Sequence, residues 1–363
     1  MKIGVVGTIW LNTPPKGYGG TEEVVYNLVN GLVEEGHEVT LFAPATAKTK
    51  AKLIPTVPKP LRDAKIDWTD SVSTLMHMTT AFDHAREFDV LHVQLNRAQD
   101  YISLPLATHC QTPVLFTLHF KLPLRDKKRL TRKLVLEKYR SLPFVSISNS
   151  QRQGMDLNYI ATVYNGLQLK QYPFFAHAGK YLVWIGRVHP DKGTKDAILA
   201  AKRAKQKLVV VGALDRGEPA IRDYYDNEIK PLLDGKEIVW AGEVSAGEKA
   251  DILGKAAAFL NPIHWEEPFG LVMTESQAVG TPVISYRRGS APELIVEGKT
   301  GFLVDSLEEM VEAISQVDKL TRTACRQNVI DHFTVPCMVD GYLDAYRTAI
   351  NDWDAIRATF QYN

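Results

Sequence analysis

Cysteine is scarce in this chain. Cys110, Cys325 and Cys337 are the only three among 363 residues, and they lie far apart. An odd, scattered set does not build a disulfide framework and is typical of a reducing compartment. None of the three has a partner at the spacing of metal ligands. We therefore expect a cytoplasmic protein that holds no metal through cysteine.

Long apolar runs and an excess of charge are also missing. No run approaches the roughly 20 apolar residues that span a bilayer. The run at 3–7 is short and lacks a cleavage site, so we interpret it as a first strand and not as a signal peptide. The net charge of +1 gives no global field that would attract nucleic acid. The composition, 45% hydrophobic and 23% charged, is typical of a globular protein, and the length suits two domains.

The chain instead contains apolar strand-like runs that alternate with helical patterns. A strand at 3–7, a helix at 21–35 and a strand at 39–43 form one βαβ unit. The pattern restarts after Asn165-Gly166 and a linker at 168–179. The other strand-like runs are 90–93, 114–118, 144–148, 181–185, 208–212, 238–242, 283–285 and 301–304. The sequence therefore predicts the α/β class, with two consecutive parallel-sheet domains.

The glycines after the first strand do not fit a dinucleotide-binding fold. That fold places G-x-G-x-x-G directly after the strand. Here the glycines, Gly17, Gly19 and Gly20, come about ten residues later. The segment 17–22 also lacks the last glycine of the motif, because Glu22 stands at that position. An NAD-dependent dehydrogenase is disfavoured. The amides of Gly19 and Gly20 can still bind an anion ahead of the helix, and a plain tight turn is the alternative.

Two acids flank a predicted junction between a strand and a helix. The apolar run at 256–260 is followed by Pro268, which suits the first turn of a helix. The amides of 269–271 would then be free donors at the N-terminus of that helix. Glu267 and Glu275 would lie about 12 Å apart along such a helix. Paired glycosidase carboxylates are roughly 5–10 Å apart, so these acids are expected to bind different parts of one extended ligand. An acidic first turn that complements the helix dipole is the alternative.

Further candidates follow predicted strands. Arg187 and Lys192 follow the first strand of the second domain, where cations suit phosphate oxygens; exposed salt bridges are the alternative. His119 directly follows the strand at 114–118, where open α/β sheets bind ligands, although a structural histidine would also fit. The one Asp-x-Asp, at 352–354, falls in a predicted helix, where side chains two apart do not face each other. We therefore expect no metal site.

The segment 121–140 is strongly basic, with nine Lys or Arg and two acids. It has a weak apolar stripe. We consider two interpretations: a solvated helix face, or a basic helix that contacts an anionic acceptor or the inner face of a membrane.

These features together resemble the family 4 glycosyltransferases, the retaining GT-B enzymes. The motifs that carry the resemblance are Gly19-Gly20-Thr21-Glu22, Thr117-Leu118-His119, Gly186-Arg187, Lys192-Gly193 and the stretch from Glu267 to Glu275, with Asn165-Gly166 and 280–284 in support. The resemblance covers essentially the whole chain. It implies two Rossmann-like domains whose parallel sheets face each other across a cleft. An acceptor-binding domain would span 1–167 and a nucleotide-sugar-binding domain 168–345, and a final helix at 346–363 would cross back.

The resemblance also implies a role for each candidate residue. Arg187 and Lys192 would hold the diphosphate, Glu275 the ribose, and Glu267 the transferred sugar. His119 would lie at the reacting sugar. The implied substrate-binding backbone and pocket positions are Gly19, Gly20, Phe269, Gly270, Leu271 and, as a weaker candidate for the base pocket, Val244.

The implied reaction is transfer of a hexosyl group with retention of configuration and without a metal ion or other cofactor. The donor would be a nucleotide diphosphate-sugar, UDP-glucose-like by preference and GDP-mannose as the second choice. The acceptor would be a small molecule, a glycan or a lipid-linked hydroxyl compound. A sugar-nucleotide epimerase and a non-catalytic sugar-nucleotide binder are the alternatives. A phosphorylase would need a pyridoxal-bearing lysine and a far longer chain. Neither the acceptor nor the oligomeric state is indicated by the sequence.

Overall fold

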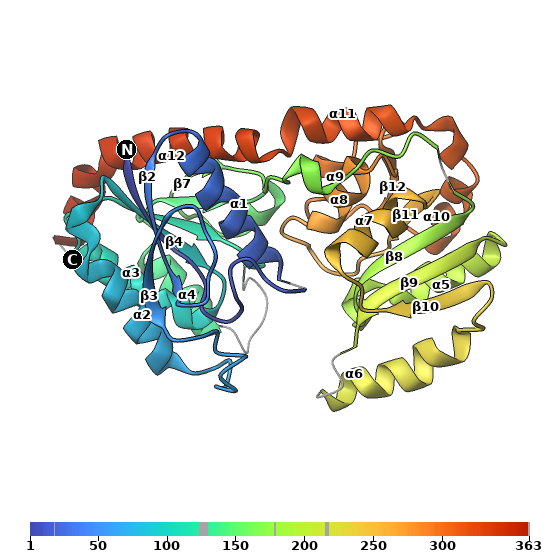
Figure 1. Ribbon diagram of the computed structural model, residues 1–363, viewed down its shortest axis with the longest axis horizontal. Coiled ribbons are helices and arrows are strands. Elements are labelled where there is room, and N and C mark those ends of the chain that lie inside the picture. The colour runs from blue at the N-terminus through green and yellow to red at the C-terminus, as the bar shows by residue number, and fades with distance from the viewer. Residues whose placement is uncertain (18, 123–129, 178, 215–217, 362–363) are drawn as a thin grey trace. The chain divides into compact units, whose positions relative to one another are not determined.

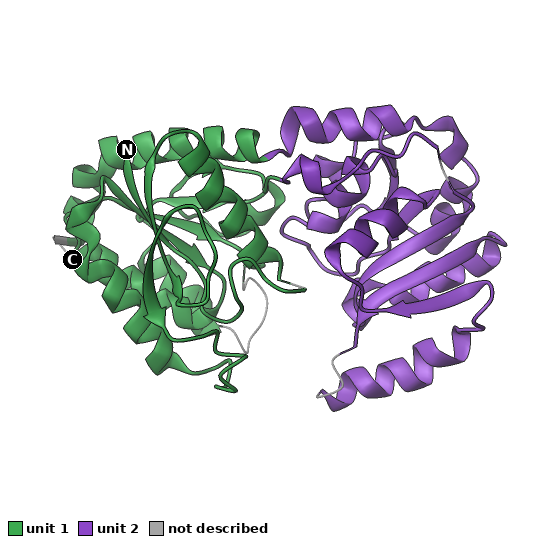
Figure 2. Cartoon of the chain, in the orientation of Figure 1, with its two compact units in different colours: residues 1–166, 335–363 green, residues 167–334 purple. Residues whose placement is uncertain are grey.

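The computed structural model of the protein describes residues 1–17, 19–122, 130–177, 179–214 and 218–361. The chain forms two compact units (Figures 1 and 2). Unit 1 comprises residues 1–166 and 335–363, and unit 2 comprises residues 167–334. We had expected the second domain to run from 168 to 345. The structure ends unit 2 at Thr334, because the last helix begins at Val335 and packs on unit 1 from its first turns.

Unit 1 is built on a seven-stranded parallel sheet in the order β3-β2-β1-β4-β5-β6-β7. Its strands are β1 (Lys2–Val6), β2 (Glu38–Pro44), β3 (Lys52–Val57), β4 (Val90–Leu95), β5 (Val114–Leu118), β6 (Phe144–Ser146) and β7 (Tyr159–Thr162). The strand order reverses between β1 and β4, which pair in parallel with Ile3 opposite Val90. Ligands of doubly wound sheets bind at such a reversal, beyond the carboxyl ends of the strands.

Helices and a continuous apolar core surround this sheet. The helices of unit 1 are α1 (Gly20–Glu34), α2 (Ser71–Asp83), α3 (Ser103–Thr108), α4 (Leu130–Lys138) and α12 (Val335–Gln361). The central strands are buried on both faces and read as near-continuous apolar runs, as parallel strands do. Helix α12 packs against α1 and against β4, β5 and β7. The long final helix is therefore an integral part of the unit 1 core, to which it contributes Trp353 and Ile356.

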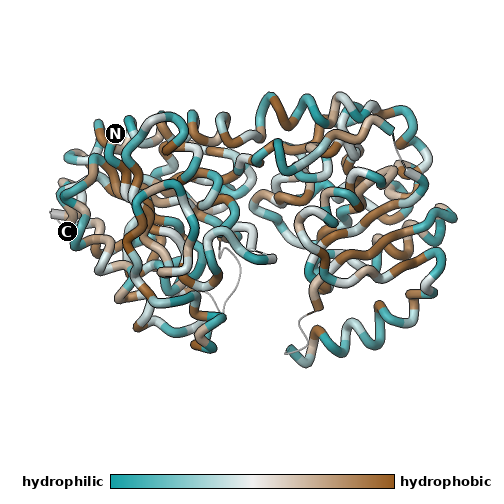
Figure 3. The backbone as a smooth tube through the Cα atoms, in the orientation of Figure 1, coloured by the Kyte–Doolittle hydropathy of each residue, from teal (hydrophilic) through white to brown (hydrophobic). Residues whose placement is uncertain are grey.

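Unit 2 repeats the plan with a six-stranded parallel sheet in the order β10-β9-β8-β11-β12-β13. Its strands are β8 (Tyr181–Arg187), β9 (Lys207–Ala213), β10 (Ile238–Gly242), β11 (Ala258–Asn261), β12 (Val283–Tyr286) and β13 (Gly301–Val304). Its helices are α5 (Thr194–Arg203), α6 (Pro219–Tyr224), α7 (Ala246–Gly254), α8 (Leu271–Ala278), α9 (Ala291–Leu294), α10 (Leu307–Ile314) and α11 (Arg322–His332). Hydrophobic residues are concentrated in the strands of both units (Figure 3). The order of this sheet reverses between β8 and β11.

Candidate functional site

Several of the predicted residues lie at the switch point of unit 2, which is the place between β8 and β11 where the strand order reverses. Arg187 is the last residue of β8, and Lys192 closes a single helical turn, η6 (Pro190–Lys192), just beyond it. The loop that leaves the neighbouring strand β11 carries Glu267 and leads into α8. Strands β8 and β11 pair in parallel, with Ala258 opposite Leu182. The sheet topology therefore brings Lys192 and Glu267 together although they are far apart in the sequence.

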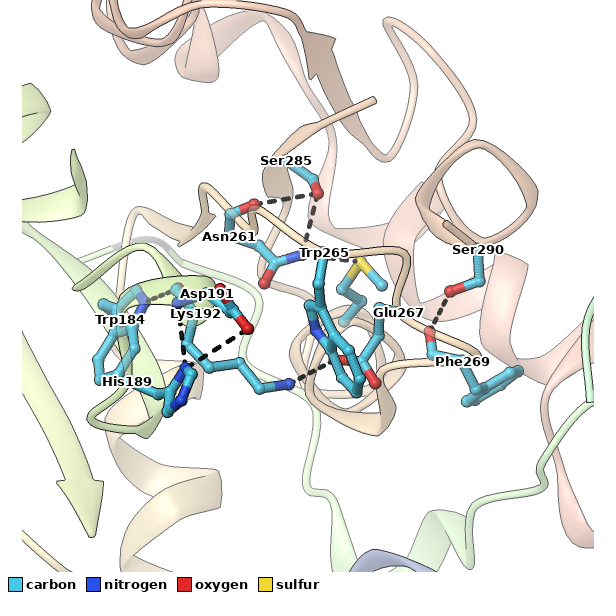
Figure 4. A network of polar contacts seen from close by, with 11 residues as sticks. Trp184, His189, Asp191, Lys192, Asn261, Trp265, Glu267, Phe269, Ser285 and Ser290 are labelled. Carbon is cyan, nitrogen blue, oxygen red and sulfur yellow. Dashed lines mark hydrogen bonds and ion pairs between the residues drawn. The ribbon is translucent and has the colours of Figure 1, made fainter. Parts of the chain in front are cut away.

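Lys192 and Glu267 form a short ion pair, with Trp265 beside both (Figure 4). Lys192 Nζ lies 2.5 Å from Glu267 Oε2, and both side chains are more than four-fifths buried. The Trp265 indole N–H donates to the same oxygen at 3.1 Å. Lys192 Nζ also lies over the indole ring, 4.7 Å from its centroid. A cation is thus held at the switch point by one carboxylate oxygen and one aromatic face.

Backbone contacts fix the loop that carries Lys192. The indole N–H of Trp184, in the buried strand β8, donates to the Lys192 carbonyl at 3.1 Å. The next residue, Gly193, has φ 69°, and a Cβ there would lie 1.8 Å from the Pro262 carbonyl oxygen. Only glycine permits this left-handed turn at such close approach. The loop after β8 is therefore pressed against the loop after β11.

The backbone of Glu267 is fixed from the opposite side. Ser290 N donates to the Glu267 carbonyl at 3.0 Å, and the Ser290 hydroxyl donates to the Phe269 carbonyl. Gly289 has φ 54°, and a Cβ there would lie 2.4 Å from the Glu267 N and O atoms. The loop after β12 therefore packs directly on the Glu267 backbone and fixes the position of that backbone.

Helix α8 starts later than the sequence predicted. We expected Pro268 in its first turn, but Gly270, with φ 84°, is the N-cap and Leu271 is the first helical residue. The left-handed backbone of Gly270 interrupts the helix, so Pro268 and Phe269 lie outside it. Phe269 is buried, and its ring packs on Phe333 with centroids 6.1 Å apart. The helix N-terminus, with its unpaired first amides, therefore begins at Gly270 and Leu271.

Glu275 lies on α8 and has partners of its own. Its Oε1 accepts from Lys249 Nζ at 2.6 Å and from the Tyr172 hydroxyl at 3.0 Å. Its side chain is only 6% exposed, and Oε2 is buried without a hydrogen-bond partner among the described residues. A buried carboxylate oxygen left without a donor costs free energy, so this atom is suited to accept from a ligand. Glu267 and Glu275 thus belong to two separate clusters, each with its own lysine.

Val244 lies further out. It follows β10, the edge strand of the sheet, and precedes α7, the helix that carries Lys249. Strand β9 separates β10 from the switch point at β8. Arg187, at the end of β8, has its side chain exposed. The structure therefore groups Lys192 with Glu267, whereas Val244 and Arg187 flank this group.

The switch point of unit 1 brings Gly20 and His119 to opposite sides of β4. Gly20 begins α1, and the Thr21 hydroxyl donates to Asn96 Oδ1, just beyond β4, at 3.0 Å. His119 follows β5, and its amide donates to the Leu95 carbonyl at 2.9 Å. Gly19 is the N-cap of α1 in an extended conformation. The predicted Gly-rich loop and the predicted histidine therefore both adjoin the carboxyl end of β4.

A buried polar network connects His119 to the last helix. His119 Nε2 lies 2.6 Å from Gln94 Oε1, and the Gln94 amide nitrogen lies 3.0 Å from His92 Nε2. His92 in turn contacts the Thr117 hydroxyl at 2.7 Å and the Tyr346 hydroxyl at 2.9 Å. Because an amide oxygen only accepts, the Gln94 contact requires the proton of His119 to sit on Nε2. Burial lowers the pKa of His119 and of His92 to about 3, so both rings are neutral at physiological pH.

The buried histidines make stability depend on pH. Burial lowers the pKa of His77 to about 4 and of His92 to about 3, whereas an unfolded histidine takes up its proton near pH 6.5. Acid therefore favours the unfolded chain, and the free energy of unfolding is expected to fall as the pH drops from about 6.5 to 4. The loss is on the order of 3 kcal/mol for each ring at pH 4.

Urea unfolding at a series of pH values measures this effect. His77 Nε2 contacts the Gly7 carbonyl at 3.0 Å, and an amide can replace that N–H donor. His77→Gln is therefore expected to be less sensitive to acid than the wild-type chain. His109→Gln, at an exposed position, is the matched control and should leave the pH dependence unchanged. Equal acid sensitivity in the wild type and His77→Gln would show that His77 is not held neutral.

Four site residues were not assigned a role from the sequence: Trp265, Lys249, Tyr172 and Gln94. Trp265 adjoins the predicted acid, but no spacing rule links an indole to a lysine that precedes it by dozens of residues. Lys249 and Tyr172 reach Glu275 from other parts of the chain. The alternation of polar His92 and Gln94 with the apolar residues of β4 is the sequence signal that could have drawn attention to Gln94.

The basic segment is described only in part. Residues 123–129 lie outside the described residues. The helix α4 that follows buries Leu136, while Leu130 and Leu134 are exposed. No helix in the described portion of the chain has the length and apolarity to cross a membrane. The described residues also contain no cluster of three or more His, Cys, Asp or Glu that could hold a metal ion.

Comparison with known proteins agrees with this fold. A family model described as "Glycosyltransferase Family 4" matches residues 18–170, and one described as "Glycosyl transferases group 1" matches residues 169–330. The two doubly wound units have the GT-B fold, which they share with solved glycosyltransferase structures. Within this fold class, the chain belongs to glycosyltransferase family 4, group 1.

Individual relatives are distant. Over 152 residues, the chain is 29% identical to glycogen synthase from Mycobacterium tuberculosis. This match covers 41% of this chain and 36% of that enzyme, so it spans little more than a third of that relative. Sucrose-phosphate synthase from Thermosynechococcus elongatus has a TM-score of 0.78 at 20% identity, with 96% of this chain and 98% of that chain covered. HepE from Anabaena in complex with UDP-glucose has a TM-score of 0.71 at 17% identity, with 96% and 99% covered. These structural likenesses show the shared fold.

Proposed function

We propose that the protein transfers a hexosyl group from a nucleoside diphosphate sugar to a hydroxyl acceptor, with retention of configuration and without a metal ion. The observation that carries this proposal is the arrangement around α8. A partly buried Lys192–Glu267 pair lies before its first turn, and a buried Glu275 oxygen, with no hydrogen-bond partner in the described part of the chain, lies on its second turn. A ligand that satisfies both must be extended and must carry an anion and hydroxyl groups, as a nucleotide sugar does.

The leaving diphosphate sets the main chemical task. Breaking the bond to the sugar leaves negative charge on the phosphate, and fixed positive groups stabilise this charge in the transition state. Lys192 and Arg187 would supply cations, and the amides at the start of α8 would supply dipoles. Lys192 is paired with Glu267 in the structure, so diphosphate binding would compete with that carboxylate. Glu267, once released, would accept hydrogen bonds from hydroxyls of the transferred sugar.

The other groups would bind the rest of the donor. Glu275 Oε2 would accept from a ribose hydroxyl, while Lys249 and Tyr172 hold the other oxygen. The peptide near Val244 would adjoin the base. In unit 1, the Gly19-Gly20 amides would contact the diphosphate. His119, neutral and held through Nε2, would offer its Nδ1 lone pair to a sugar hydroxyl.

The proposed donor is UDP-glucose or a related hexose, with GDP-mannose as the second choice. The comparison structure of HepE with UDP-glucose supports a uridine donor for a chain of this fold. The acceptor would be a small molecule, a glycan or a lipid-linked compound. We also propose a cytoplasmic protein, with the segment 121–140 as the place where an anionic membrane would be contacted.

The released sugar reports the stereochemistry without knowledge of the acceptor. Water can replace the acceptor slowly, so we expect the protein, with UDP-glucose and a metal chelator, to release glucose and UDP. Proton NMR in the first minutes should show α-glucose before mutarotation, because UDP-glucose is an α-glycoside. Release of β-glucose would contradict retention, and loss of activity with the chelator would contradict metal independence. Conversion to another UDP-sugar would indicate an epimerase, and binding without turnover would indicate a non-catalytic binder.

A further inference from the structure

The Trp265 side chain contacts both members of the Lys192–Glu267 pair. Its N–H donates to Glu267 Oε2, and its ring face lies 4.7 Å from Lys192 Nζ. We propose that Trp265 is a positioning residue that keeps Glu267 oriented while a nucleoside diphosphate draws Lys192 away from it. This inference rests on the proposed function of the same site and adds a residue to which that function assigns no role.

One carboxylate oxygen of Glu267 accepts from two donors. Lys192 and Trp265 both donate to Glu267 Oε2, at 2.5 Å and 3.1 Å. A diphosphate would attract the ammonium group, and Glu267 would then lose its cationic partner. A partly buried carboxylate without a donor is costly and free to turn. The indole N–H remains on Oε2, and Oε1 is left for a hydroxyl of the sugar.

The Trp265 indole makes its two contacts in different directions. Its N–H lies in the ring plane, whereas its attraction for a cation acts at the ring face. The two contacts therefore use different parts of one rigid side chain, and one can change while the other persists. Lys192 would therefore move along the ring face toward a phosphate while the indole N–H stays on Glu267.

The position of Trp265 itself is fixed by its neighbours. The amide of His264 donates to the Asp191 carbonyl at 2.8 Å, which joins the loop after β11 to the η6 turn that carries Lys192. Its imidazole Nε2 lies 2.9 Å from Asp196 Oδ2 on α5. Trp265 is therefore held between two anchored residues, since the Glu267 carbonyl accepts from Ser290 N.

Two substitutions separate the two contacts. Trp265→Phe keeps an aromatic face for Lys192 and removes the N–H donor. We expect kcat for UDP-glucose turnover to fall about tenfold, the share of one hydrogen bond to a charged group, with the affinity for UDP changed less than about twofold. Trp265→Leu removes both contacts and is expected to lower kcat as much and to weaken UDP binding about three- to tenfold.

A double-mutant cycle tests whether Trp265 acts through Glu267. In a Glu267→Ala background, we expect Trp265→Phe to change the residual kcat less than about twofold, because its partner is already gone. A full tenfold loss in that background would overturn the inference, as would wild-type kcat in Trp265→Phe. Equal loss of kcat and UDP affinity in Trp265→Phe would show a merely structural role.

The same measurements distinguish the inference from the proposed function. A wild-type chain that neither binds UDP nor turns over UDP-glucose would contradict the proposed function itself. A wild-type chain that does both, while Trp265→Phe is indistinguishable from it, would contradict only the inference. Thermal unfolding of each variant should accompany the kinetics, so that a variant that fails to fold is replaced by Trp265→Tyr, which also lacks the indole N–H.

Discussion

Replacing Lys192 by alanine is expected to lower turnover of the donor by about 10²–10³-fold, the usual effect of removing one group that stabilises developing charge. Lys192 is the partly buried cation at the switch point of unit 2, and the diphosphate is the only part of the donor that needs a cation. The same substitution should weaken UDP binding at least tenfold, because the lost contact is made with bound UDP as well as in the transition state. Initial rates with UDP-glucose and calorimetric titration with UDP measure the two effects.

Lys195→Ala is the matched control for this experiment. Lys195 lies three residues further along the chain and pairs with Glu228 at 2.5 Å, with both side chains exposed. Its removal changes the net charge by the same amount without altering the switch point. We expect near-normal turnover and unfolding in this variant. Full turnover in Lys192→Ala would contradict the assignment of the diphosphate to this residue.

Glu267→Gln is expected to lower turnover without weakening UDP binding, whereas Lys192→Ala lowers both. The amide keeps the shape of the side chain but lacks the charge that holds Lys192 in the ion pair. Because UDP no longer competes with a carboxylate for Lys192, its affinity should stay the same or rise several-fold. Turnover should nevertheless fall about 10²-fold, since the sugar hydroxyls lose a charged acceptor in the transition state.

Glu266→Gln controls for the loss of an acid in this loop. Glu266 is the neighbouring residue, and it accepts from the Gly289 amide at 2.6 Å, a bond that glutamine can also accept. We expect this variant to behave as the wild type in both assays. A loss of UDP affinity in Glu267→Gln as large as that in Lys192→Ala would contradict the competition between the carboxylate and the diphosphate.

Much of the fold follows from local pattern. The apolar runs at 39–43 and 114–118 became the buried strands β2 and β5, because parallel strands covered on both faces must be apolar along their length. Edge strands carry a weaker signal. Strand β3 begins at Lys52 and includes Pro55, and no strand was predicted there, since an edge strand is half exposed and tolerates proline.

Element boundaries depended on contacts that local pattern does not contain. The sequence suggested a helix from Pro268, but Gly270 adopts a left-handed conformation that delays the start of α8 to Leu271. The sequence also placed the return to the first domain at residue 346. Val335 already begins the helix that packs on unit 1, and helical periodicity alone does not show which unit a helix contacts.

Within the site, the motif residues were predictable, whereas their partners were not. Lys192, Glu267 and Glu275 stand at positions where strand ends and a helix start suggest ligand contacts. The residues that hold them are Trp265, Lys249 and Tyr172, and they come from three different segments. The roles of the site residues toward a ligand stay predictions. What the structure adds is the pairing, and the pairing produces the competition on which the Glu267 and Trp265 experiments depend.

Calorimetric titration of the whole chain with UDP-glucose, GDP-mannose, UMP and glucose 1-phosphate, beside the Lys192→Ala variant, tests the central claim most directly. We expect saturable binding of one nucleoside diphosphate sugar. UMP and glucose 1-phosphate, which each lack part of the diphosphate-linked donor, should bind at least tenfold more weakly, and Lys192→Ala should lose most of the donor affinity. Absence of saturable binding by any nucleoside diphosphate sugar, or equal binding of the donor by wild type and Lys192→Ala, would contradict the proposed donor site.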